Sequence, residues 1–161
     1  MMPMGQGPDL DRISTEAIRE VLTTQFRLPI FAASSDEVGW ASVNPHGLTG
    51  SVSLEGPEIR GEVRLQFPES WLSTLNASLG PVSPDPADRA SEMWDLASEL
   101  CNMVAGRIGA GLAAAGHICT LSTPDVASGP QNPVEAGPGA KRSHTHWTCA
   151  GATLTLTVWI K

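Results

Sequence analysis

The feature that most constrains this chain is a helical pattern of about 30 residues in its second half. Asp85 is a suitable N-cap, Pro86 suits the first helical position, and Gly116 marks the expected end. Between these limits the apolar residues recur at spacings near 3.6, which gives the helix one broad apolar side. That side predicts a core face, and its members are Met93, Leu96, Ala97, Leu100, Cys101, Val104, Ile108 and Leu112.

Two β-hairpins flank this helix in the sequence. Residues 48–55 and 59–67 alternate apolar and polar side chains and are joined by a short link, which predicts the first hairpin. Residues 143–149 and 152–160 predict the second, with a turn at Ala150-Gly151.

Further helices are expected over residues 11–27 and 68–79, where apolar residues again follow helical spacing. One or two strands are expected within residues 30–43, with the best pattern over 38–43. A short strand is expected over residues 117–122.

Residues 127–142 are rich in Gly and Pro and poor in apolar side chains, which predicts a loop. The resulting order is α, β, β, β, α, α, β, β, β. This order predicts an α+β fold, with helices packed on a mainly antiparallel sheet. A length of 161 residues suits one domain. We expect residues 1–10 to be a disordered N-terminus and residues 11–161 to form the single domain.

The charge balance excludes several classes of protein. The chain has 17 acidic and 10 basic residues, a net charge of -7 with histidine neutral. A nucleic-acid binder or a protein docked on an anionic membrane needs an excess of Lys and Arg, so we expect neither partner. No run of 18 apolar residues could span a membrane, and the first residues do not resemble a signal peptide. Three cysteines without a CxxC pair favour reduced thiols, so a cytoplasmic location is expected.

The polar side of the long helix carries a ridge formed by Asp95, Glu99, Asn102 and Gly106. Their spacings of four, three and four residues place them on one face. Gly106 has no side chain, so the backbone of a partner could approach closely there. An amide cannot act as a general base, and one carboxylate makes a poor enzyme on its own. The ridge is therefore suited to entering a partner's active site, where the carboxylate pairs with a cation and the amide orients a water.

The alternative is that Asp95 and Glu99 are ordinary solvated charges, since every amphipathic helix has a polar face. By pattern alone this is the commoner case. Two details favour the functional interpretation. Asn in a helix interior costs about half a kcal/mol or more relative to Ala. The ridge also lies beside Met103 and Gly106, and not among Lys and Arg residues that would neutralise it.

The segment ELCNMVAG at residues 99–106 resembles the E-x-x-N-M-x-x-G signature of the CheC/CheX/FliY family, and most of all its CheX branch. Asp95, four residues before Glu99, fits the longer form of that signature. The first hairpin and the Pro68-Glu69 pair that follows it resemble the stretch that precedes the signature in this family. Residues 121–129 resemble the stretch that follows the helix. The resemblance runs from about residue 12 to residue 129.

The resemblance implies a CheC/CheX-like fold and a phosphatase that acts on CheY, the phosphorylated response regulator of bacterial chemotaxis. It implies that Glu99 pairs with a lysine in the regulator's active site and that Asn102 positions the attacking water. Asp95, Met103 and Gly106 would then contact the partner. It implies no cofactor bound by this chain, because the magnesium ion belongs to the regulator. It also implies a homodimer.

Two other interpretations stay open. The chain could be a non-catalytic adaptor of the same fold that binds a receiver domain without hydrolysing its phosphate. It could also be a structural α+β domain without either role. A phosphatase predicts that Asn102→Ala removes activity, whereas an adaptor predicts binding that survives this change.

Two further groups of side chains could have a function. His144 and His146 place two imidazoles on one face of a strand, with Cys149 three residues beyond, which is half of a zinc site. Nothing else nearby supplies obvious ligands, so no metal is expected. Tryptophans more often fill cores or interfaces, although Trp94, next to Asp95, could lie at the rim of the docking surface.

Overall fold

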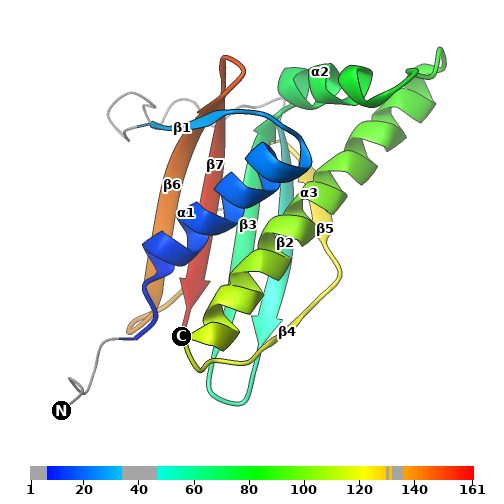
Figure 1. Cartoon of the computed structure of the whole chain (residues 1–161). Helices are drawn as coiled ribbons and strands as arrows, with labels where there is room; N and C mark the ends of the chain where they lie inside the picture. The colour runs from blue at the N-terminus through cyan, green and yellow to red at the C-terminus, as the bar shows by residue number, and fades with distance from the viewer. Residues whose placement is uncertain (1–6, 34–46, 130, 132–135) are drawn as a thin grey trace.

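The computed structural model describes residues 7–33, 47–129, 131 and 136–161. A seven-stranded sheet carries the helices α1 (Leu10–Glu20) and α3 (Pro86–Ala114) on one face (Figure 1). Its order is β1-β6-β7-β3-β2-β4, with β5 also paired to β2, and every described pairing is antiparallel. The strands are β1 (Ile30–Ala33), β2 (Gly47–Glu55), β3 (Arg60–Pro68), β4 (Thr120–Leu121), β5 (Asp125–Ser128), β6 (Lys141–Cys149) and β7 (Ala152–Ile160).

The long helix α3 forms where the sequence predicts it. The Asp85 side chain accepts a hydrogen bond of 2.9 Å from the backbone N–H of Ala87, and Pro86 occupies the first turn. The helix continues for 29 residues through three glycines without a break. It ends before Gly116, whose φ of +92° is the left-handed conformation that glycine adopts readily. No helix in the described part of the chain has the length and apolar character needed to cross a membrane.

The other two predicted helices also form. The helix expected over residues 11–27 is α1 followed by η1 (Val21–Gln25), a turn of π-helix. The N–H of Leu28 donates to the carbonyl of Leu22 at 2.9 Å and closes this segment. The helix α2 (Glu69–Leu79) follows β3 directly and packs against α3.

Both predicted hairpins form at the predicted positions. In the first, Val52 lies opposite Val63 in the β2–β3 pair. In the second, Trp147 lies opposite Leu154 in the β6–β7 pair. The two hairpins join through the β3–β7 pair, which makes the centre of the sheet.

The bounds predicted for the loop over residues 127–142 are wrong at both ends. Its first two residues belong to β5, and its last two open β6. The strand β5 has four residues and pairs with β2, where Val126 lies opposite Gly50. So short a strand has no periodic signal of its own, because its structure comes from the neighbouring strand. The strand expected over residues 117–122 is likewise only the two-residue β4. The expected strand over 38–43 lies outside the described residues.

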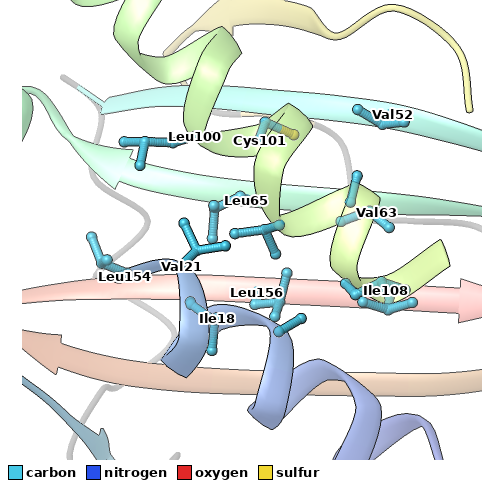
Figure 2. Packing of buried hydrophobic residues seen from close by; sticks show 14 of the residues in the cluster. Ile18, Val21, Val52, Val63, Leu65, Leu100, Cys101, Ile108, Leu154 and Leu156 are labelled. Atoms are coloured by element: carbon cyan, nitrogen blue, oxygen red, sulfur yellow. The ribbon is translucent and has the colours of Figure 1, made fainter. Parts of the chain in front are cut away.

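The core lies between the helices and the sheet. Figure 2 shows side chains from α1, η1 and α3 meeting those of the central strands, and all of them are buried. The labelled members are Ile18, Val21, Val52, Val63, Leu65, Leu100, Cys101, Ile108, Leu154 and Leu156. The helix α3 lies very close to β2 at Gly50. A Cβ atom on Gly50 would lie only 2.7 Å from the Cβ of Cys101.

Close packing also joins α3 to α1. A Cβ atom on Gly111 would lie 2.8 Å from Cγ2 of Ile13, whose side chain is buried. A Cβ atom on Gly106 would meet nothing within 4 Å. The two glycines therefore differ in surroundings although they belong to the same helix.

This difference predicts opposite effects of the same substitution. Gly106→Ala should raise the free energy of unfolding by up to about 1 kcal/mol, the helix-propensity difference. The free energy of unfolding of Gly111→Ala should be lower than that of Gly106→Ala by about 1 kcal/mol or more, because Ile13 must move in a packed core. Urea denaturation measures both values. Equal gains in stability would contradict the α1–α3 packing.

Candidate functional site

The predicted ridge is exposed along one face of α3. Asp95, Glu99, Asn102 and Gly106 are all accessible to solvent. Six of the eight residues between them are buried, namely Leu96, Ala97, Leu100, Cys101, Val104 and Ala105. Because the apolar side of α3 is held down along its length, the rotation of the helix is fixed and the ridge must point outward. The structure thus brings the four residues together as the spacing predicts.

The side chains of the ridge are uncommitted within the described structure. Asp95, Glu99 and Asn102 make no hydrogen bond or ion pair with another described residue. Arg107, the next residue after Gly106, pairs instead with Glu20 of α1 at 3.3 Å between Nη1 and Oε1. The nearest cation in the sequence is therefore turned toward α1, and the Glu99 carboxylate is left available to a cation from outside.

The surface at Gly106 is open, in contrast to the glycines that follow it. A Cβ atom on Gly109 would lie 3.4 Å from Cδ1 of Leu121, which covers that turn of the helix. Nothing covers Gly106 in the same way. A bare helix surface beside an exposed amide allows a partner backbone to come close.

Met103 and Cys101 are the neighbours of Asn102 and differ in role from the ridge. Met103 is half-buried and packs against the hydrophobic core, so it lies at the edge of the ridge. Cys101 is fully buried. Burial raises the pKa of the Cys101 thiol to about 12, and the carboxylate of Glu62 adds to the rise. A neutral, buried thiol is not a nucleophile, which leaves the amide and carboxylates as the chemistry of this face.

His144 and His146 do not come together with Cys149, the third residue of the possible half zinc site. His144 and His146 contact each other, with their ring centroids 4.8 Å apart. Their Nδ1 atoms share hydrogen bonds with the hydroxyls of Thr157 and Thr155, at 2.7 and 3.0 Å. Burial lowers the pKa of both imidazoles, so their neutral forms are favoured. Cys149 is buried and follows the alternate strand positions that face the helices, and no set of three candidate metal ligands occurs among the described residues.

Two features of the ridge face of α3 are not evident from the sequence. Leu121 is exposed beside α3, and only its tertiary contact with Gly109 reveals that position. The helices and their N-caps also hold ten acidic and four basic residues, most of the chain's net charge of -7. The linear sequence does not show this concentration, because α1 and α3 are far apart in the chain and adjacent in the fold (Figure 1).

The geometry of the ridge face is suited to contact with another molecule. It offers one amide, two carboxylates and a bare turn on the convex surface of a rigid helix. An exposed amide and an exposed carboxylate can bind and orient the groups of another molecule.

Comparison with known proteins identifies the family. The family model described as "Chemotaxis phosphatase CheX" matches residues 48–146, more than half of the chain. The match includes the first hairpin, α3 with its ridge, and most of β6. No curated protein sequence matches the chain.

Solved structures share the fold over almost the whole chain. The chemotaxis protein CheX from Vibrio vulnificus aligns with a TM-score of 0.76 at 16% identity, covering 98% of this chain and 99% of that one. A CheC-like superfamily protein from Shewanella sp. PV-4 gives 0.70 at 19% identity, covering 97% and 99%. CheX from Borrelia burgdorferi, in a complex with CheY, BeF3 and Mg, gives 0.71 at 15% identity, covering 95% and 98%.

Proposed function

Because the chain belongs to the CheX family of chemotaxis phosphatases, we propose that it hydrolyses an aspartyl phosphate on a CheY-type response regulator. The observation that carries the proposal is the exposed pair of Glu99 and Asn102, held on one face of a rigid helix without described partners. The complex of a related CheX with CheY supports this class of partner.

The chemistry requires positioning more than proton transfer. Water attacks the phosphorus atom, the bond to the aspartate carboxylate breaks, and inorganic phosphate and a free carboxylate result. Asn102 accepts a hydrogen bond from the attacking water through its carbonyl oxygen and holds it in line with the leaving group. Correct placement of reactants alone supplies a large part of such rate increases.

Glu99 anchors the regulator. Its carboxylate pairs with the lysine of the regulator's active site, which places Asn102 three residues further along the same face. Asp95 and Gly106 extend the contact in the two directions along α3, and Met103 borders it. The magnesium ion that neutralises the phosphoryl charge belongs to the regulator, as the BeF3- and Mg-containing complex of a related protein suggests.

The charge distribution supports the same partner. The helical side of the molecule holds most of the net negative charge, and the ridge lies on that side. A negative surface attracts a cationic group such as the regulator's lysine and raises the rate of encounter. The attraction should weaken as salt is added.

The first functional prediction concerns Asn102→Ala. It should lower kcat/KM for a phosphorylated CheY-type receiver by about 100-fold, because the water loses its position. The same change should raise the stability of α3 by about half a kcal/mol, since Asn is a poor residue in a helix interior. Glu99→Gln should lower kcat/KM by about tenfold or more through the lost ion pair. Release of phosphate from the receiver measures the rates.

The control for charge is Glu16→Gln. Glu16 is also an exposed helix carboxylate, but it belongs to α1 and pairs with Arg12. It should leave kcat/KM within about twofold of the wild type, because an exposed pair contributes little. Full activity of Asn102→Ala would refute the mechanism. Tight receiver binding without hydrolysis by the wild type would assign the chain to the adaptor class.

The second functional prediction concerns Gly106→Ala. The added methyl group meets no atom of this chain, so the folded protein accepts it. A partner backbone seated against the bare turn would be displaced, and affinity for a BeF3-activated receiver should fall by about tenfold. Titration calorimetry measures this change. An unchanged Kd for a variant of raised stability would show that the partner does not approach Gly106.

We also propose a homodimer, as the family resemblance implies. The edge strand β1 supports it, because Phe31 is exposed there and β1 pairs only with β6 among the described strands. Sedimentation equilibrium should give a mass of twice 16.9 kDa. A single-chain mass at micromolar concentration would reject the dimer.

A further inference from the structure

Trp94 is exposed, unlike the two described tryptophans that lie in the core. Trp71 and Trp147 are 4% and 2% exposed and fill the interior. Trp94 is 41% exposed and lies in the first half of α3, next to Asp95. A large indole kept at the surface gives up part of the stabilisation that burial would provide, which is about 25 cal/mol for each Å² of apolar surface.

The position of Trp94 links it to the ridge. Trp94, Ser98, Asn102 and Gly106 follow one another at spacings of four residues, which is a single row along a helix surface. Trp94 therefore begins the row that contains the proposed catalytic amide. Eight residues at 1.5 Å each place it about 12 Å from Asn102 along the helix axis.

Leu121 lies on the same side of the ridge as Trp94, toward the C-terminal end of α3. It is 38% exposed and covers Gly109, about 10 Å beyond Asn102 along the axis. Trp94 and Gly109 differ by about 60° in direction around the helix, so both apolar groups lie on one side of the ridge. Together they bracket Glu99 and Asn102.

The size of a stable interface decides whether a partner would reach them. A standard interface covers about 800 Å² on each partner, which corresponds to a radius of about 16 Å if it is round. A regulator centred on Asn102 would therefore cover both Trp94 and Leu121. Tryptophan is among the residues that contribute most to protein–protein affinity when a partner covers it.

We propose that Trp94 and Leu121 are docking contacts that hold the receiver domain on the ridge. This inference rests on the proposed function, and the occupant is the receiver itself. Glu99 and Asn102 meet groups that every phosphorylated receiver needs for its chemistry. Trp94 and Leu121 instead meet the receiver surface around the active site. Trp94 is the stronger contact, because its side chain is larger and lies in the row of Asn102.

The experiment uses the full chain and a CheY-type receiver of the same organism that the wild type dephosphorylates. The receiver is phosphorylated with acetyl phosphate, and initial rates are measured over a range of receiver concentrations. Trp94→Ala should raise KM by about tenfold and leave kcat within about twofold, since it contributes to docking but not to the reacting atoms. Trp94→Phe should recover most of the loss. Leu121→Ala should raise KM by a smaller factor.

The matched control is Ile118→Ala. Ile118 is 71% exposed but follows the end of α3, more than about 18 Å from Asn102 along the helix and outside the expected interface. It should leave KM unchanged. Circular dichroism and urea denaturation check that each variant folds as the wild type does.

The outcomes separate this inference from the function on which it rests. Loss of activity in Asn102→Ala together with an unchanged KM in Trp94→Ala would overturn the inference alone. A lower kcat with an unchanged KM would also overturn it. If Trp94→Ala changed the oligomeric mass and left KM unchanged, a second copy of the chain would be the occupant and the inference would be wrong. Full activity of Asn102→Ala would overturn the proposed function itself.

Discussion

The contact between α3 and β2 at Cys101 and Gly50 is the constraint on which the rest of the structure depends. Only a residue without a side chain lets the helix lie this close to the strand, and a Cβ atom there would be 2.7 Å from that of Cys101. The contact fixes the rotation of α3 as well as its height above the sheet. Successive helix residues differ in direction by about 100°, so a slip of one residue would turn Asn102 from the outer surface toward the edge of the core. Burial of one face thus sets the geometry of the opposite face.

Much of this arrangement could be predicted from the sequence because it depends on local chemistry. Asp85 and Pro86 define the start of α3, and the periodic apolar residues define which side is buried. The strand alternation likewise fixes the register of both hairpins, since a shift of one residue would expose every core side chain. The remainder depends on contacts that are distant in sequence. The strand β5 exists only because β2 offers it an edge, and Leu121 reaches Gly109 of α3 only because β4 pairs with β2 beside that helix. No local pattern encodes either contact.

The candidate site likewise combines features encoded locally in the sequence with features that depend on distant contacts. The identities and spacing of Glu99 and Asn102 were readable from the sequence, and the structure adds that neither has a partner among the described residues. It also shows that Arg107 is held by Glu20, which keeps a nearby cation away from the ridge. A helix surface with an exposed amide, free carboxylates and a bare turn is a poor active site for one molecule. It is well suited to completing the active site of another, where phosphate, metal and lysine are already in place. Under the proposed function, the chain supplies position and the regulator supplies the phosphoryl group.

The most direct test of this account is the lifetime of the aspartyl phosphate in a CheY-type receiver mixed with a saturating excess of the wild-type chain. Rapid-quench measurement in a single turnover removes any effect of product release or of repeated encounter. The lifetime should be at least about 100 times shorter than in the receiver alone, since positioning of the water accelerates the chemical step itself. A receiver that binds the chain and keeps its phosphate for the same time as the free receiver would contradict it.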